Sequence, residues 1–145
     1  MARLIGYIRR FPVLPILGDG ESLQQPVYVR DLSDAVAACL GTGCTVRRSY
    51  NVSGAAPLTY NAVVDTVAAA LGRRVAKAHL PLGVARAVVA AQQCVLPRPL
   101  LRVEQVLRLN ENKVFSHEEA ARDFGYRPLA FEEGIRYEIA EMDHA

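Results

Sequence analysis

Residues 25–32 read QPVYVRDL, and this stretch decides the fold. Pro26–Val29 predicts a strand, and Asp31 follows it in position to cap a helix that runs to about Leu40. Ser49–Val52 predicts a second short strand beyond that helix. A strand, a helix and a strand in this order have the form of a βαβ unit, which indicates an α/β fold.

Two strands around one helix cannot make a complete sheet. Both outer edges would stay unpaired, and parallel strands are normally covered on both faces. We therefore interpret the chain as a piece of a larger sheet. The helix should have one apolar face, formed by Leu32, Ala35, Val36, Cys39 and Leu40.

Helical periodicity predicts four more helices outside this unit, over residues 2–10, 60–71, 117–124 and 131–142. Pro81 and Pro99 each suit the first turn of a further helix. A turn at Gly18–Gly20 and a strand over residues 75–80 complete the pattern. Helices and short strands thus alternate along the whole sequence, as expected for an α/β chain with few strands.

Two of these helices carry clear start and stop signals. Thr59 is a suitable N-cap for one, and Gly72 ends it as a left-handed residue would. The S-x-x-E spacing of residues 116–119 predicts a capping box for the other, with His117 as its first residue and Gly125 as its stop. Asp123, inside that helix, is predicted to be solvated, and neither it nor His117 is assigned a catalytic role.

Composition excludes several classes of partner. The 145 residues suffice for one domain, and 17 lysines and arginines nearly balance 15 aspartates and glutamates. The basic residues are scattered as pairs, so we expect no nucleic-acid partner. Cys39, Cys44 and Cys94 have neither disulfide nor zinc spacing, which indicates reduced thiols with Cys39 as a core residue. With no secretory pattern and no long apolar stretch, we expect a cytoplasmic protein without membrane contact.

Two glycine pairs invite comparison with a dinucleotide-binding loop. Such a loop needs G-x-G-x-x-G between a strand and a helix, because only glycine lets the backbone approach the pyrophosphate closely. Leu23 stands at the third glycine position after Gly18-Asp19-Gly20, and Val46 stands there after Gly41-Thr42-Gly43. We therefore predict that neither turn binds a cofactor phosphate.

Three motifs follow one another along the chain: QPVYVRDL at residues 25–32, YNVSG at residues 50–54 and ARDFGYRP at residues 121–128. Together they resemble the C-terminal part of the extended short-chain dehydrogenases/reductases, the NAD-dependent epimerase/dehydratase family. The resemblance implies that residues 1–145 form a single, mostly helical, substrate-side C-terminal fragment of a Rossmann-like fold, with late strands near 26–29 and 49–52. It also implies that the N-terminal cofactor-binding half is absent.

In that family a Tyr-x-x-x-Lys pair exchanges a proton while a hydride moves to or from the nicotinamide. The only lysines here are Lys77 and Lys113, and neither lies four residues after a tyrosine. No catalytic and no cofactor-binding residue is therefore assigned. The resemblance implies NAD or NADP as the cofactor, but we do not expect this chain alone to bind it or to be active.

The resemblance also implies positions that face a substrate. Family members that act on nucleotide sugars commonly carry one arginine two residues before the position of Pro26 and another after a later helix, and both bind the diphosphate. The matching residues here are Gln24 and Asn110, which disfavours a nucleotide-sugar substrate. Gln25 and Asp31 complete the implied substrate-side set, with Asp31 predicted foremost as a helix cap.

Three interpretations of the chain stay open at this point. In the first interpretation, the chain is the substrate-binding C-terminal portion of an epimerase/dehydratase-like oxidoreductase, which acts on a small-molecule substrate. Alternatively, it is a stand-alone binding or assembly module without catalysis, similar to an accessory subunit of respiratory complex I, in which a partner chain completes the sheet. In the third interpretation it is a homo-oligomer that closes its sheet against a second copy.

Overall fold

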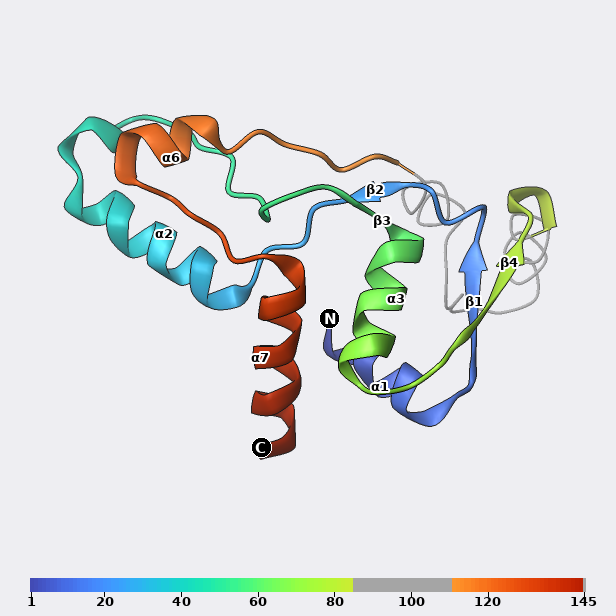
Figure 1. Ribbon diagram of the computed structural model, residues 1–145. Coiled ribbons are helices and arrows are strands. Elements are labelled where there is room, and N and C mark those ends of the chain that lie inside the picture. Colours follow the sequence, from blue (N-terminus) through green and yellow to red (C-terminus); the bar gives the residue numbers. More distant parts are fainter. Residues whose placement is uncertain (85–110, 145) are drawn as a thin grey trace, which may run out of the picture.

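The computed structural model describes residues 1–84 and 111–144 of the chain. Helices and short strands alternate along these residues, which confirms the predicted α/β class (Figure 1). The elements are α1 (Ala2–Arg10), β1 (Val13–Leu17), β2 (Leu23–Gln24), α2 (Val29–Gly41), a 3-10 turn (Gly43–Thr45), β3 (Leu58–Thr59), α3 (Tyr60–Ala70), β4 (Ala76–Leu80), α6 (Glu118–Phe124) and α7 (Phe131–His144). None of the helices in this described part is long and apolar enough to cross a bilayer.

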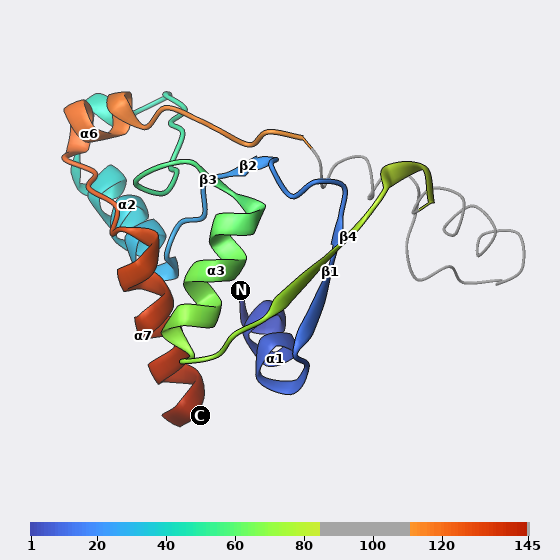
Figure 2. The ribbon, with the colours of Figure 1, turned by 45° about the vertical axis from the view of Figure 1, so that its right-hand side comes forward.

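The described strands form two small sheets. β1 and β4 run parallel, with Val13 opposite Ala76 at one end and Leu17 opposite Leu80 at the other. β2 and β3 are antiparallel, and Leu23 lies opposite Thr59. The parallel pair is joined by a long crossover that contains α2 and α3, as parallel strands require (Figure 2).

The main core joins elements that are far apart in sequence. On β1, Leu14 and Ile16 alternate with exposed residues and face the helices. The N-terminal helix α1 and the C-terminal helix α7 both pack on α3 in both ribbon views (Figures 1 and 2). The buried residues of this core are Ile5, Ile8, Leu14, Ile16, Val64, Val67, Ala68 and Ile135.

A second, smaller core lies between α2 and α6. Its buried members are Ala35, Ala120 and Tyr126. The half-buried side chains that surround them are Val27, Tyr50, Val52 and Phe124. Since two of the three buried residues are alanines, this core removes much less apolar area from water than the main one.

Helix ends follow local chemistry closely where the sequence signal is strong. The Thr59 hydroxyl oxygen accepts a hydrogen bond from the amide of Ala62 at 3.1 Å, which is the predicted N-cap contact. Gly72 and Gly125 follow α3 and α6 with φ angles of 63° and 73°. A side chain would be strained in this left-handed conformation, so glycine stops both helices as predicted.

The two strands expected near residues 26–29 and 49–52 are wrong. Residues 26–28 and 49–52 are irregular, and Val29 already belongs to α2. One backbone hydrogen bond joins the neighbourhoods of the two segments, from the amide of Gly54 to the carbonyl of Gln25 at 3.3 Å. A strand needs a ladder of such bonds, and Pro26 has no amide to donate. Within residues 1–84 and 111–144 no further strand lies beside either segment, so no ladder forms.

Two predicted caps are also corrected. α2 begins at Val29 with Tyr28 as its N-cap, so Asp31 is the third helical residue and not the cap. Its carboxylate accepts a hydrogen bond from the amide of Leu129 at 2.9 Å instead. Its position in the first turn still suits the positive end of the helix dipole.

The expected capping box of α6 forms only in part. The Ser116 hydroxyl oxygen accepts from the amide of Glu118 at 3.3 Å, and not from that of Glu119. His117 is the N-cap residue of this helix instead of its first residue. The helix is short and its start is held by contacts from another segment, described below.

The expected apolar face of α2 is largely unburied. Of its five predicted residues only Ala35 is buried, and Cys39 is half-buried instead of being part of the core. The closing helix α7 agrees better with its pattern. Ile135 is buried, and Phe131, Ile139 and Met142 pack against the main core.

Truncation of Ile135 tests the main core. Ile135 is 2% exposed, whereas Leu40 on α2 is 87% exposed. We expect Ile135→Ala to lower the free energy of unfolding by about 2–5 kcal/mol, because it removes buried apolar area and leaves a cavity. Leu40→Ala is the control and should change it by less than about 0.5 kcal/mol. Urea unfolding of both variants measures the difference, and equal losses would contradict the assigned packing.

Candidate substrate cleft

The three sequence motifs converge in space on residues 50–54. Gln25, from the first motif, donates from its side-chain amide to the carbonyl of Gly54 at 2.8 Å. Tyr126, from the third motif, donates from its hydroxyl to the carbonyl of Ser53 at 2.9 Å. The middle motif is therefore held from two directions by side chains that are distant in sequence.

Gly54 allows the first and second motifs to approach each other closely. A Cβ atom at this position would lie 2.0 Å from the carbonyl oxygen of Pro26. That distance is far inside van der Waals contact, so any side chain would push the two backbones apart. Glycine at residue 54 is thus required by the close approach.

Ser53 connects the middle motif to the segment that precedes α6. Its hydroxyl donates to the carbonyl of Phe115 at 2.8 Å and lies 3.0 Å from Nδ1 of His117. Because the hydroxyl hydrogen points to Phe115, its oxygen can accept a hydrogen bond from a protonated Nδ1. The His117 ring also meets the Tyr126 ring edge-on at 5.6 Å. These contacts hold His117 at the N-cap position of α6, although its side chain makes no capping hydrogen bond.

A cleft of about 360 Å³ opens beside this junction. This volume lies at the lower end of the range found for small-molecule sites. The cleft is mostly apolar, with a few polar groups. Its lining residues are Met1, Gln24, Gln25, Pro26, Val52, Ser53, Tyr60, Val63, Lys113 and Phe115.

Gln24 and Lys113 supply the polar groups that a ligand could use. The backbone amide of Lys113 donates to the carbonyl of Leu23 at 2.8 Å, which holds Lys113 beside β2. Within the described residues, neither the Gln24 amide nor the Lys113 ammonium group has a side-chain partner. Both groups can therefore bind hydroxyl or anionic groups of a ligand.

Gln25 also lines the cleft, but its side chain is already used. Its Oε1 accepts from the amide of Phe115 at 3.0 Å while its nitrogen donates to Gly54. Both ends of the amide hold backbone, so Gln25 shapes the cleft wall.

The predicted substrate-side residues do not all meet. Gln24 and Gln25 line the cleft, whereas Asp31 lies on α2 and is bonded to the amide of Leu129. Asn110 lies outside the described residues. Sequence reasoning missed Lys113 and Tyr60; the rarity of lysine, with two in the chain, was the signal that could have drawn attention to Lys113.

Burial raises the pKa of both tyrosines near the cleft. Desolvation raises the pKa of Tyr60, and it raises that of Tyr126 to about 12, with a smaller contribution from the negative charge of Asp31. Both phenols are therefore held in their neutral form and act as hydrogen-bonding or packing groups.

Asp123 is not the solvated residue that the helix pattern predicts. Its side chain is 10% exposed and accepts hydrogen bonds from the Tyr50 hydroxyl at 2.8 Å and from Arg122 at 2.9 Å. Arg48 adds an ion pair at 3.1 Å. The Tyr50 hydrogen bond, followed by that of Arg122, holds the pKa of this carboxyl below its usual value. Asp123 thus binds the second motif to the third.

The glycine turn at residues 18–20 does not suit a cofactor phosphate. A Cβ on Gly20 would lie 2.4 Å from Oδ1 of Asn61, so the space beside this glycine is filled. Asn61 itself donates to the carbonyl of Asp19 at 2.9 Å and to the carboxylate of Glu21 at 2.7 Å. Negative charge beside the turn would repel a pyrophosphate. Gly41 is the last residue of α2, so the second glycine pair follows a helix and does not open one.

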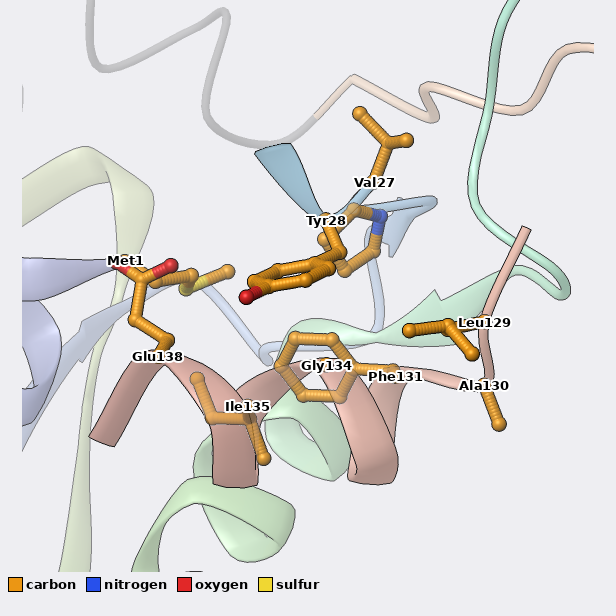
Figure 3. Close-up of a pocket in the computed structure, with 10 residues that line it drawn as sticks. Met1, Val27, Tyr28, Leu129, Ala130, Phe131, Gly134, Ile135 and Glu138 are labelled. Atoms are coloured by element: carbon orange, nitrogen blue, oxygen red, sulfur yellow. The ribbon is translucent and has the colours of Figure 1, made fainter. Parts of the chain in front are cut away.

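A smaller hollow of about 30 Å³ lies where residues 26–28 cross α7. Figure 3 shows the Tyr28 ring facing Gly134 and Phe131, with Leu129 and Ile135 beside them. Gly134 makes the crossing close, since a Cβ there would lie 3.2 Å from that of Tyr28. The Tyr28 hydroxyl donates to Glu141 at 3.0 Å. The hollow has room for one or two water molecules, so it is a packing joint and not a ligand site.

The sequence has no match among known protein families or curated proteins. Solved structures do match. The crystal structure of gox2253 has a TM-score of 0.74 and 16% identity, and the match covers 99% of this chain and 43% of that one. UDP-glucose 4-epimerase from Thermotoga maritima, solved with UDP-glucose, has a TM-score of 0.71 and 18% identity. That match covers 99% of this chain and 38% of the epimerase. dTDP-glucose 4,6-dehydratase from Bacillus anthracis, solved with NAD, has a TM-score of 0.67 and 17% identity. That match covers 98% of this chain and 38% of the dehydratase.

The fold is therefore that of a part of the Rossmann-like epimerases and dehydratases, as the motifs implied. The chain spans about two fifths of the length of these structures.

Replacement of Gly54 tests the junction behind the cleft. We expect Gly54→Ala to destabilise the protein by about 1–3 kcal/mol, because its methyl group would overlap the Pro26 carbonyl. Gly6→Ala is the matched control, since Gly6 lies inside α1 and a Cβ added there would meet nothing within 4 Å. That variant should gain about 0.5–1 kcal/mol of stability. Thermal or urea unfolding compares the two, and a neutral Gly54→Ala would disprove the close approach.

Tyr126→Phe should show a stability difference that depends on pH. At neutral pH the variant loses the bond to Ser53, which costs about 1 kcal/mol. The pKa of Tyr126 rises from 10.0 to about 12 on folding, so its neutral form favours the folded state below pH 10 and this contribution falls between pH 10 and 12. Phenylalanine does not ionise, so the free energy of unfolding of the variant has no such pH dependence. The difference between the unfolding free energies of the two proteins should therefore narrow between pH 10 and 12. Urea unfolding across the range measures it, and a constant gap would count against a buried Tyr126.

Proposed function

We propose that residues 1–145 are a single substrate-binding unit of an NAD(P)-dependent epimerase/dehydratase-like oxidoreductase, inactive until joined by a dinucleotide-binding part. The observation that carries this proposal is the convergence of three separate motifs on residues 50–54, beside a cleft that the first two motifs line. That convergence occurs in a fold shared with part of several epimerases and a dehydratase.

The residues present indicate which functional groups this chain would supply and which the dinucleotide-binding part would supply. Bound NAD or NADP would accept or return a hydride. The phosphate-binding turn and the Tyr-x-x-x-Lys pair are not found in these 145 residues, so the other part would supply them. This chain would hold the substrate through Gln24 and Lys113 and exclude water with the apolar cleft wall of Val52, Val63 and Phe115.

The cleft favours a hydroxylated substrate with little negative charge. The solved neighbours include enzymes named for UDP-glucose, UDP-glucuronic acid and dTDP-glucose. Here the uncharged amide of Gln24 can bind sugar hydroxyls, but it cannot form the paired, charged contact that an arginine makes with a diphosphate. Lys113 carries the one cationic side chain among the described lining residues. We therefore propose a small hydroxylated compound with at most one anionic group.

A second candidate, an assembly module without catalysis, is favoured by the exposed apolar face of α2. It predicts a stable complex with a partner that shows no turnover, and assay of that complex separates the two. The free thiols of Cys39 and Cys44 suit a reducing compartment, and we propose a cytoplasmic location for either candidate.

The substitution Gln24→Arg tests the substrate assignment. It should strengthen binding of UDP-glucose by about tenfold or more, because a guanidinium group adds charge-assisted hydrogen bonds to the diphosphate. Binding of glucose, which has no phosphate, is the control and should not improve. Calorimetry on the purified chain measures both, and NADH and NADPH should bind neither protein in the micromolar range.

Two outcomes would contradict the proposed function. Equal affinity of UDP-glucose for the wild type and for Gln24→Arg would show that residue 24 does not face a ligand diphosphate. Micromolar binding of NADH or NADPH to the wild-type chain would show that the cofactor site is here and not in another part.

A further inference from the structure

Two arginine pairs that are distant in sequence meet at one surface of the fold. The pair at residues 9–10 ends α1, and the pair at residues 73–74 follows α3. Just beyond the second pair, the backbone amide of Ala76 donates to the carbonyl of Pro12 at 2.9 Å and joins the two segments. Both ribbon views show the chain between α3 and β4 running beside α1 (Figures 1 and 2).

The two segments contain no carboxylate side chain. Residues 1–18 carry three arginines, and residues 68–84 carry two arginines and one lysine. Neither range contains an aspartate or a glutamate. Over the whole chain basic and acidic residues are nearly balanced, at 17 and 15, so the excess of positive charge is a local property of this surface.

Carboxylates from other parts of the described chain pair with two of these cations. Arg9 pairs with Asp143 of α7 at 2.6 Å, and Lys77 pairs with Asp65 of α3 at 2.7 Å. Asp143 therefore places negative charge beside the arginines on the α7 side, and Asp65 does so on the α3 side.

Three arginines of this surface are exposed and available. Within residues 1–84 and 111–144, Arg10, Arg73 and Arg74 form no ion pair with a carboxylate. The Arg73 side chain donates one N–H to the carbonyl of Ile8 at 3.5 Å, which leaves its other donors free. Its backbone amide donates to the carbonyl of Ala68 at 2.9 Å, so the turn that carries residues 73–74 has a fixed backbone.

Apolar side chains are exposed beside these arginines. Phe11 is 43% exposed, and the guanidinium carbon of Arg10 lies 5.8 Å from the centroid of its ring. The Tyr7 ring lies 4.7 Å away on the other turn of α1 and holds Phe11 in place. Val13, at the start of β1, is 46% exposed. Arginines and an aromatic ring together are typical of the residues that dominate protein–protein interfaces.

We propose that Arg10, Phe11, Arg73 and Arg74, the arginine patch, bind an acidic segment of a partner protein. Closely spaced carboxylates of that segment would form paired, charge-assisted hydrogen bonds with the guanidinium groups. An apolar residue between the carboxylates would pack on Phe11. No residue of the patch lines the cleft, so the partner would not compete with a substrate and the proposal does not depend on the proposed function.

A membrane surface or a nucleic acid fits the patch less well. A helix that lies in a membrane interface inserts an apolar face, but Ile5 and Ile8 of α1 are 0% exposed and belong to the main core. A nucleic acid would continue past the patch along its phosphate backbone, where Asp143 and Asp65 would repel it. A short acidic segment can stay clear of both carboxylates.

A second copy of this chain offers few free carboxylates to the patch. Its most acidic element is α7, in which three carboxylates are already in ion pairs within the chain, at Glu132, Glu141 and Asp143. Docking through these residues would break the existing pairs. A different protein with an unpaired acidic segment therefore suits the patch better.

Binding of a glutamate-rich peptide to the whole chain tests the patch. The probe is a fluorescently labelled peptide of sequence EELEELEE, and the peptide QQLQQLQQ with the same label is the charge control. We expect the glutamate peptide to bind at low ionic strength, where charges are screened least. The glutamine peptide should bind at least tenfold more weakly. Fluorescence anisotropy measures both affinities.

Substitutions at Arg74 locate the binding to the patch. Arg74→Glu should weaken binding of the glutamate peptide at least tenfold, because it replaces a cation with a like charge. Arg127→Glu is the matched control, since Arg127 is also exposed but lies beside α2, and it should retain the affinity. Arg74→Lys keeps the charge and loses the planar fork, so its affinity should be intermediate. Both glutamate variants should keep the urea midpoint of the wild type, because they change exposed side chains.

Other results overturn the proposal. No binding of the glutamate peptide, equal binding of the two peptides, or equal losses in Arg74→Glu and Arg127→Glu would each do so. Tighter binding of phosphatidylserine/phosphatidylcholine vesicles or of oligothymidylate, abolished by Arg74→Glu, would assign the patch to a membrane or to a nucleic acid. A doubling of the mass in solution that the same variant abolishes would assign it to a second copy.

Discussion

The close approach of Gly54 to the backbone of Pro26 is the constraint on which the candidate site depends. A Cβ at residue 54 would lie 2.0 Å from the Pro26 carbonyl oxygen, so the two segments meet only because this residue has no side chain. Once they meet, Gln25 can span the gap to Gly54, and the carbonyl of Ser53 lies within reach of Tyr126. The cleft is the space left beside this junction. Its shape therefore depends on this backbone contact as well as on the side chains that line it.

The two cores of the molecule differ in a way that bears on function. The main core buries isoleucines and valines from α1, β1, α3 and α7, so it closes on itself. The small core buries two alanines and one tyrosine, and its helix exposes aliphatic side chains to water. A region so thinly packed gains little from apolar burial alone, which is why hydrogen bonds to Asp123 and Ser53 are prominent there. The cleft is lined from both regions, by Val63 of α3 and by Val52 beside the small core.

The candidate site is predictable to the extent that it lies within local motifs. Gln24 and Gln25 lie at the start of the QPVYV stretch and do line the cleft. The sequence places Asp31 correctly on a helix, but its partner is the amide of Leu129, which is 98 residues away and has no signature in sequence. The short, polar helix around Asp123 predicts a solvated side chain. Its burial comes from Tyr50, Arg48 and Arg122, and only the folded chain brings the first two to it.

The sequence by itself determined where the described helices and β4 lie, both ends of α3, the glycine that stops α6, and the absence of a phosphate-binding turn and a Tyr-x-x-x-Lys pair. These are local properties, because caps, glycine stops and spacing act over a few residues. Tertiary structure alone decided that residues 26–29 and 49–52 are not strands, since a strand exists only where another backbone pairs with it. It also decided which face of α2 is covered. Periodicity shows that a helix has an apolar side, but burial depends on what the rest of the fold brings against that side.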